Sequence, residues 1–420
     1  MEQYFKQAIA NIKENPRASF LIILGTTLAV AMMMVLVLIY QVKTTSYSPV
    51  SQRNRLLYIN IIEGLDDTAK GGYRGAGLGY RIINECFYNM TTPERMTAAS
   101  SGTSLKLIST PGNSKKRECD TRETDFNFWK VFDFRFISGS PYDEAMFNSA
   151  LPVAVISDRI AREFFGSTDV AGQTIQLDFV DFKVQGVVSS VSEIVSEAYG
   201  EIWIPFSLND NIMKGDIVEG IGGNLHLFIL AKSTSDFDAI RNEAQSRVSA
   251  FNTGQKEFFA GIWKQPITSF QTMYYHVMND RMHGTFWGML MLAILFLVLP
   301  ILNLIGIRHS QIKKRSPEFG LRKAFGATTY EVMMQLFAEN LIITLIGSII
   351  GLFLSVFFFY IAKDSLLERP DVDLQISMII KPTLLIAALF ICLLINILST
   401  AYATWKTAKA DVVESLNANI

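Results

Sequence analysis

The part of this sequence that comes nearest to a nucleotide site is residues 166–174, GSTDVAGQT. A phosphate loop has four residues between its glycines and a lysine after the second glycine, and the charge of that lysine meets the phosphates. Here five residues separate Gly166 from Gly172, and Gln173 stands in the place of the lysine. The segment lacks the group that would do the chemistry, and no other stretch comes closer. We therefore expect any ATP hydrolysis to occur on another chain.

The other residues that could do chemistry do not form a catalytic or metal-binding pattern. None of the four histidines has a second His or Cys at metal-ligand spacing. No G-x-S-x-G turn and no Cys–His pattern indicates a nucleophile. Gly75, Gly77 and Gly79 predict a glycine-rich turn rather than a dinucleotide site, because no strand leads tightly into them and no clear amphipathic helix follows. We expect a non-catalytic chain with no cofactor of its own.

Four apolar stretches determine the class of protein. Residues 18–42, 284–307, 340–362 and 382–405 contain no Asp, Glu, Lys, Arg or His, and about 20 apolar residues suffice for a helix to cross a bilayer. Four buried helices of a soluble core are the less favoured alternative, since core helices rarely run so long without a charge. The sequence predicts an α-helical membrane protein with four transmembrane helices in contact with lipid, the third belonging to a longer helix over 332–362.

The positive charges of the short loops predict the orientation. Lys and Arg are concentrated in residues 1–17, 308–331 and the tail 406–420, whereas the loop 363–381 mixes basic and acidic residues. We expect both termini and the 308–331 loop in the cytoplasm. The first apolar stretch could be a signal peptide, but its apolar run is longer than a signal's and no small-residue cleavage site follows, so it is predicted to be a retained anchor. The net charge of −1 gives no reason to expect a nucleic-acid partner.

Residues 43–283, 241 in all, are predicted to form a mixed α/β extracytoplasmic domain between the first two membrane helices, with two subdomains whose boundary the sequence does not fix. Alternating or Val- and Ile-rich runs predict strands, and caps with apolar helical spacing predict helices. The expected strands are 56–63, 105–109, 127–139, 152–157, a hairpin over 174–188, an edge-like strand over 201–206, and 226–231. The expected helices are 158–166, capped by Asp158 and ended by Gly166, and 235–251.

Two of the three cysteines, Cys86 and Cys119, fall in this outer domain. Oxidising conditions outside the cytoplasm would permit a disulfide between them. Two separate, small buried residues are the alternative, and the sequence does not decide between the two. Cys392 lies in the fourth apolar stretch, where we expect it to pack against neighbouring helices.

The cytoplasmic loop contains signals for a short helix, a glycine break and then a long helix. Ser316 can cap the short helix, with Glu318 in its first turn. Gly326 suits the left-handed residue that ends such a helix. Thr328 and Glu331 have the spacing of a capping box that would begin the long helix.

Two pairs of glycines at four-residue spacing occur at the membrane stretches, Gly284 with Gly288 and Gly347 with Gly351. Such spacing lets helices approach closely in lipid. The second pair lies in the middle of its stretch, so Gly347 and Gly351 are the stronger candidates for a helix-packing site.

At residues 315–328, RSPEFGLRKAFGAT, the chain resembles the E-I-G-[IL]-R-[KR]-A-[LF]-G-A signature of the MacB/FtsX-type ABC permeases. Outer segments NFWKVFDFRFISG, PVAVISDRIAREFFG, VAGQTIQ, FKVQGVV and IWIPF follow, in order, the motifs of the MacB-type periplasmic core domain. The tail AYATWKTAKADVVESLN is similar to the family's closing W-x-A-x-x-x-P-x-x-x-L, except that Asp411 or Val412 stands where the proline usually is.

The resemblance implies a mechanism and a set of partners. It implies a permease of the bacterial inner membrane that dimerises with a second copy or a paralogue, binds separate ABC ATPase subunits carrying ATP and Mg, and transmits motion to its outer domain without passing substrate through the membrane. A periplasmic adaptor and an outer-membrane channel would be further partners. Only 17 residues precede the first apolar stretch, so the ATPase is expected on a separate chain. The residues expected to dock on it are Glu318, Phe319, Gly320, Leu321, Arg322, Lys323, Ala324, Gly326 and Ala327.

Three alternatives remain at this point. The 308–331 loop could be a solvated cytoplasmic turn whose basic residues serve topology alone. The chain could be a mechanical regulator or scaffold that controls an extracytoplasmic hydrolase and exports nothing. A membrane-bound enzyme with its site in 43–283 is the least favoured, because no constellation supports it. An outer region of 241 residues favours the MacB or LolC/LolE type over the smaller FtsX-type division regulators, and the family's substrates are peptides, antibiotics, toxins or lipoproteins.

Overall fold

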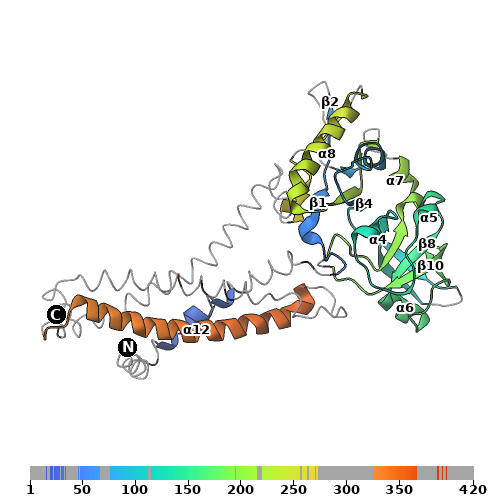
Figure 1. The fold of residues 1–420 in the computed structure, drawn as a ribbon. Coiled ribbons are helices and arrows are strands. Elements are labelled where there is room, and N and C mark those ends of the chain that lie inside the picture. The colour runs from blue at the N-terminus through green and yellow to red at the C-terminus, as the bar shows by residue number, and fades with distance from the viewer. Residues whose placement is uncertain are drawn as a thin grey trace. The chain divides into compact units, whose positions relative to one another are not determined.

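A computed structural model gives the fold of the chain (Figure 1). It describes residues 46–66, 76–111, 115–214, 220–272 and 325–366, except positions 47, 194, 256–257, 263 and 270, together with parts of 16–34 and the single residues 321, 386, 390 and 394. Two of the expected membrane stretches, 284–307 and 382–405, lie outside the described residues apart from Ile386, Phe390 and Leu394. The chain divides into two compact units. Lys43–Met278 and Leu367–Leu374 form the outer unit, and Met1–Val42, Asn279–Leu366 and Gln375–Ile420 form the other.

The outer unit is built on one 13-stranded sheet. Its strands are β1 (Leu56–Ile59), β3 (Gly77–Leu78), β4 (Arg95–Ser100), β5 (Ser104–Ser109), β6 (Lys116–Thr124), β7 (Phe136–Gly139), β8 (Val153–Ser157), β9 (Thr174–Leu177), β10 (Val180–Val188), β11 (Ile202–Pro205), β12 (Gly222–Gly223), β13 (Leu225–Leu230) and β15 (Ile267–Thr268). A separate two-stranded sheet pairs β2 (Glu63–Asp66) with β14 (Phe258–Gly261).

Helices and short helical turns cover the sheet. They are η1 (Arg53–Arg55), α3 (Tyr80–Ile82), the π-helical η2 (Ile83–Phe87), α4 (Phe128–Val131), α5 (Glu144–Asn148), α6 (Asp158–Phe165), η3 (Phe206–Leu208), α7 (Asp210–Lys214), η5 (Thr234–Asp236) and α8 (Phe237–Asn252). In Figure 1, α6 lies beside β8 and β10, and α8 lies beside β1.

Half of the sheet closes into a barrel. The order β11-β8-β10-β9-β5-β6 returns on itself because β11 also pairs with β6, in parallel, with Ile202 opposite Thr121. The interior is filled by apolar side chains from these strands and from α6, among them Ile108, Ile156 and Ile204. Closure removes the free strand edges that an open sheet would leave at this end.

The other half is an open sheet in which β4, β13, β1 and β15 follow β6. Side chains alternate between its two faces: Leu57 and Ile59 of β1 pack with α3, η2 and α8 on one face, whereas Leu56 and Tyr58 pack with α4 and Trp203 on the other. Burial of both faces explains why β1 and β13 are nearly continuous apolar runs rather than alternating ones. Trp203 belongs to β11, so the second cluster joins the open sheet to the barrel.

Most of the expected elements are present, but several details were wrong. The expected strand 56–63 is divided: β1 ends at Ile59, and Glu63 begins β2 in the separate two-stranded sheet. The aromatic run 127–139 begins as α4, and its strand, β7, starts only at Phe136, because the aromatic side chains pack around Trp129 instead of alternating. The 201–206 segment is not an edge strand: β11 lies between β8 and β6, and Pro205 is its last residue. Helix α6 is capped by the Ser157 hydroxyl, with Asp158 inside its first turn.

The described part of the other unit contains one long helix, α12 (Thr329–Leu366), of 38 residues. It begins three residues before the expected start and ends four after the expected end. Its segment Leu341–Phe358 is long and apolar enough to cross a membrane, and a shorter apolar helix covers Ser19–Met32. At 1.5 Å per residue α12 is about 57 Å long, well beyond a hydrocarbon core of about 30 Å.

A tight backbone contact in the glycine-rich segment gives the first prediction. A Cβ on Gly79 would lie 2.1 Å from the Gly220 carbonyl oxygen, whereas a Cβ on Gly102 would meet nothing within 4 Å. Gly79→Ala should lower the free energy of unfolding of the outer unit by about 1–3 kcal/mol, which is several degrees in its midpoint. Thermal unfolding of the purified chain measures the effect, with Gly102→Ala as the matched control. Equal midpoints for the two variants would contradict the described contact.

Candidate functional site

The expected docking segment is described only at its end. Leu321 is helical and exposed, and its carbonyl accepts a hydrogen bond from the Phe325 amide at 3.1 Å. Gly326 follows with a left-handed φ of +97°, and Ala327 is half-buried. Phe325 leaves 84 % of its surface exposed. Glu318, Phe319, Gly320, Arg322, Lys323 and Ala324 lie outside the described residues.

A capping box begins α12 immediately after this break. The Glu331 carboxylate accepts hydrogen bonds from the Thr328 amide at 2.8 Å and from the Thr328 hydroxyl at 3.0 Å, and the Glu331 amide donates back to the hydroxyl at 3.3 Å. These bonds from the Thr328 amide and side chain lower the pKa of Glu331 below its usual value. The reciprocal cap was predicted from spacing alone, and it is confirmed. It joins the signature segment to the long helix with no loop between them.

Gly347 and Gly351 lie where α12 approaches the helix over Ser19–Met32. A Cβ on Gly347 would lie 2.8 Å from the Thr26 Cβ, and one on Gly351 would lie 2.7 Å from the Thr27 carbonyl oxygen. The Thr27 hydroxyl donates a hydrogen bond to the Gly347 carbonyl at 3.2 Å. Absence of both glycine side chains therefore lets the two backbones come close together.

Polar and apolar side chains divide α12 into two faces. Small hydroxyl side chains are buried on the face that carries the glycines: Thr344, Ser348 and Ser355. The large apolar side chains exposed elsewhere on the helix are Ile346, Ile349, Ile350, Phe353, Val356, Phe357, Phe358 and Ile361. This division fits a helix that packs through small residues and presents large apolar ones to lipid.

Both outer cysteines are free thiols in the structure. Cys86 lies in the cluster between the open sheet and α8, and Cys119 lies in the barrel interior, so they belong to different cores. Burial raises the pKa of each thiol to about 12. Of the two alternatives left open by the sequence, the structure has two separate buried residues.

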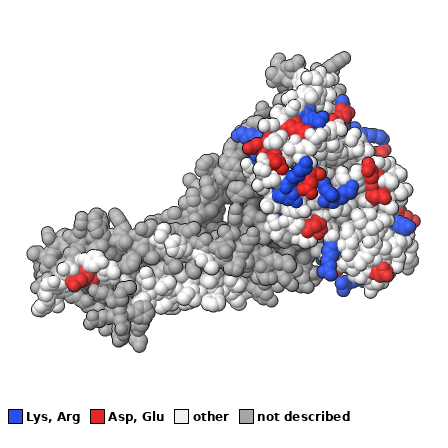
Figure 2. Space-filling view, viewed as in Figure 1, with Lys and Arg blue, Asp and Glu red and all other residues white. Residues whose placement is uncertain are grey.

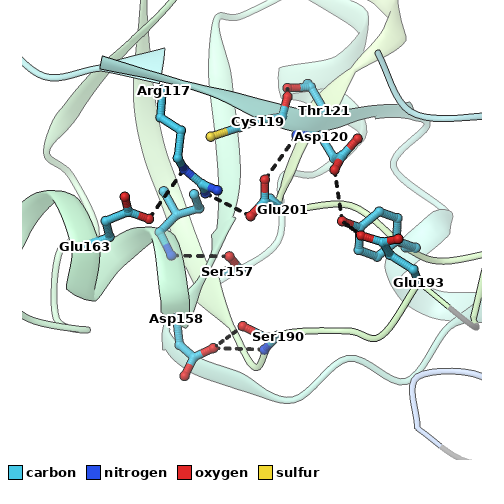
Figure 3. Close-up of polar contacts among 12 residues, drawn as sticks. Arg117, Cys119, Asp120, Thr121, Ser157, Asp158, Glu163, Ser190, Glu193 and Glu201 are labelled. Atoms are coloured by element: carbon cyan, nitrogen blue, oxygen red, sulfur yellow. Dashed lines mark hydrogen bonds and ion pairs between the residues drawn. The ribbon is translucent and has the colours of Figure 1, made fainter. Parts of the chain in front are cut away.

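The densest polar network of the outer unit joins β6 to α6 and β11 (Figure 3). The Arg117 guanidinium lies 2.8 Å from Glu201 and 3.4 Å from Glu163, and the second Glu201 oxygen accepts from the Asp120 amide at 3.2 Å. The Tyr199 hydroxyl lies 3.0 Å from Asp120 and 2.9 Å from a further carboxylate, that of Glu193. Each group contacts a neighbour on another element, so the network ties strands together.

Two fully buried charged side chains have similar roles. The Arg122 guanidinium donates to the carbonyls of Tyr199, Ser100 and Ser196, and burial lowers its pKa to about 10, so it remains charged at neutral pH. Burial raises the pKa of Asp125, although its carboxylate accepts from Thr97, Tyr88 and the amides of Ala98 and Phe128. Buried charges that are hydrogen-bonded to several neighbouring elements are typical of structural joints.

The charged side chains of the described residues are mixed in sign and do not gather at one site on the visible face (Figure 2). Among the described residues, no group of three or more His, Cys, Asp or Glu side chains could hold a metal ion. On the face seen in Figure 2, basic and acidic residues are interspersed over the outer unit, whereas the described part of the other unit is almost uncharged.

These observations define the class first: a chain with a long apolar helix packed through glycines and a large, separate mixed α/β unit. Comparison with known families gives the rest. Residues 19–247 match the MacB-like periplasmic core domain, and residues 290–412 match the FtsX-like permease C-terminal domain. The chain belongs to the MacB/FtsX-type ABC transporter permeases, a family of the inner membrane whose permease domains are generally non-catalytic.

Individual members of this family are similar to the chain at low sequence identity. The chain is 24% identical over 263 residues to the ABC transporter permease YknZ of Bacillus subtilis, covering 59% of this chain and 60% of YknZ. It is 23% identical over 236 residues to the macrolide export ATP-binding/permease protein MacB of Escherichia coli K12, covering 54% of this chain and 34% of MacB. The chain therefore spans less than two thirds of either relative.

Solved structures of similar outer domains include the periplasmic region of MacB from Actinobacillus actinomycetemcomitans, with 14% identity, a TM-score of 0.37, and coverage of 54% of this chain and 95% of that one. The extracellular domain of YknZ has 15% identity, a TM-score of 0.34, and coverage of 48% and 100%.

The capping box gives a second prediction. Thr328→Ala removes the hydroxyl that bonds the Glu331 amide, so the first turn of α12 should fray and its amide hydrogens should exchange several-fold faster at neutral pH. Thr328→Ser keeps the hydroxyl and is the matched control. Because the folded pKa of Glu331 is lowered, the cap should be fully present above the usual glutamate pKa and be lost as pH falls through the lowered value. Unchanged exchange in Thr328→Ala would show that the cap does not hold this turn.

The contact between α12 and the helix over Ser19–Met32 gives a third prediction. Gly347→Val or Gly351→Val places methyl groups against Thr26 or Thr27. Each variant should lower the free energy of unfolding by about 1–3 kcal/mol, which is measured as a lower thermal unfolding midpoint in detergent. Ile349→Val alters an exposed side chain of the same helix, and it should stay within about 0.5 kcal/mol of the unaltered chain. The contact would be absent in solution if all three variants unfolded at one temperature.

Proposed function

We propose that this chain is a permease subunit that transmits conformational change from a separate cytoplasmic ABC ATPase to the extracytoplasmic domain, for export or release of a peptide, antibiotic, toxin or lipoprotein. Family membership supports an ATPase partner. The observation that carries the proposal is the direct joint between the signature segment and α12: Gly326 ends one helix and the Thr328–Glu331 box begins the next.

In the proposed arrangement, the four apolar stretches cross the inner membrane with both termini in the cytoplasm, and residues 318–327 form the segment that docks on the ATPase. Movement of this segment would displace the start of α12, because only Thr328 separates the two and the capping box fixes the first turn of the helix. Since α12 is about 57 Å long, its first turns would extend into the cytoplasm beyond the membrane core. A rigid helix of this length carries displacement from one side of the membrane to the other.

A second permease copy or a paralogue, docked beside this chain, completes the proposed assembly. A periplasmic adaptor and an outer-membrane channel are further proposed partners of the outer domain. ATP and Mg would be held by the ATPase chains.

Co-purification tests the proposal. The full chain, solubilised from its native membrane, should retain an ABC ATPase subunit. Arg322→Glu should reduce this retention and the ATP-linked function at least tenfold, equivalent to about 1.4 kcal/mol of docking free energy, while membrane insertion is unchanged. Arg95→Glu, at an exposed position of the outer domain, is the matched control. The proposal would be contradicted if Arg322→Glu kept both ATPase retention and ATP-linked function. It would also be contradicted if an extracytoplasmic hydrolase co-purified without an ATPase.

A further inference from the structure

The first and the last strand of the main sheet are neighbours. β1 and β15 pair antiparallel, with Leu57 opposite Thr268 and Tyr58 opposite Ile267. The start of β1 at Leu56 and the end of β15 at Thr268 therefore lie side by side at one edge of the sheet.

The segment that leads into β1 is bonded to the connection between α4 and β7 before the strand begins. The Asp133 amide donates to the Pro49 carbonyl at 2.9 Å, the Ser48 hydroxyl donates to the Asp133 carbonyl at 2.9 Å, and the Ser51 amide donates to the Asp133 carboxylate at 3.2 Å. Residues 48–55 are consequently part of the folded unit and do not form a loose linker.

An ion pair fixes the end of this segment. The Arg53 guanidinium lies 3.2 Å from the Glu197 carboxylate, and only 3% of the Arg53 side chain and 16% of the Glu197 side chain are exposed. The Tyr58 hydroxyl donates to the other Glu197 oxygen at 3.4 Å. Pairs this well buried are screened little by water, unlike the neighbouring surface pair of Arg55 and Glu94.

Glu197 lies in the connection between β10 and β11, and Arg122 holds the same connection from the opposite side. The Arg122 guanidinium donates to the Ser196 carbonyl at 2.7 Å and also to the Tyr199 carbonyl, which bracket Glu197 in the sequence. Arg122 belongs to β6, the strand that the barrel and the open sheet share. A continuous series of charged contacts therefore runs from Arg53 through residues 196–199 to β6.

We infer that the Arg53–Glu197 ion pair is the joint through which displacement of the segment after the first apolar stretch reaches the barrel half of the outer unit. Without the pair, residues 196–199 would keep their bonds to Arg122 and the apolar packing of Ala198 with β1, but they would lose this charged contact with the segment before β1. The role of this joint rests on the proposed transmission of motion from an ATPase. The coupling between residues 53–58 and 196–200 can nevertheless be measured without an ATPase.

Hydrogen–deuterium exchange on the full chain in lipid nanodiscs tests the joint. Arg53→Ala should raise amide exchange at least tenfold at residues 53–58 and also at 196–200, where no side chain has been altered. Glu197→Gln keeps the shape of the side chain but removes its charge, so it should give a smaller increase in amide exchange at residues 53–58 and 196–200. Arg55→Ala is the control from the same helical turn, and it should raise exchange only near Ala231 and Lys232, whose carbonyls Arg55 contacts.

A charge exchange covers the case in which Arg53→Ala does not fold. Arg53→Glu combined with Glu197→Arg should restore protection at 196–200 relative to Arg53→Glu alone. Increased exchange confined to 53–58, an equal effect of Arg55→Ala at 196–200, or no restoration by the double variant would overturn the joint. None of these exchange results depends on whether an ATPase co-purifies with the chain. An outcome that overturns the joint can therefore be told apart from one that overturns the proposed function.

Discussion

The pairing of β6 with three other strands is the constraint on which the outer unit depends. This nine-residue strand contacts β5 and β11 in the barrel and β4 in the open sheet. Two of its side chains, those of Arg117 and the buried Arg122, also contact neighbouring elements. Loss of register along β6 would expose its buried residues and would break the barrel and the sheet together, since a shift of one residue turns every side chain to the other face.

Local signals in the sequence predicted most elements of the outer unit, because strands such as β8 and β13 are short apolar runs and α6 has a hydroxyl cap and a glycine end. Closure of the barrel was not predictable in the same way. It depends on β11 meeting β6, about 80 residues earlier, and Pro205 gave the opposite indication. The aromatic run at 127–139 misled for a related reason: its side chains pack around Trp129 and against Trp203, which lies on β11 and is distant in sequence.

The candidate site shows the same difference between local and distant information. The Thr328–Glu331 box and the left-handed Gly326 involve residues within a single turn, so spacing alone was sufficient to find them. Gly347 and Gly351 were recognisable as small residues, but their partner was not, since the Thr27–Gly347 hydrogen bond spans 320 positions. The Arg53–Glu197 pair and the buried Arg122 gave no signal, because isolated charges in a polar segment are usually solvated.

The two buried thiols have a consequence for the reactivity of the outer unit. Burial raises the pKa of each thiol to about 12, so both are held in the protonated form at neutral pH and not as the reactive thiolate. Neither cysteine can take part readily in thiol–disulfide exchange, and the fold contains no bond that an oxidase must make between them. Once the outer unit has folded, both thiols are therefore shielded from oxidants and from thiol reagents, because each is buried as well as protonated.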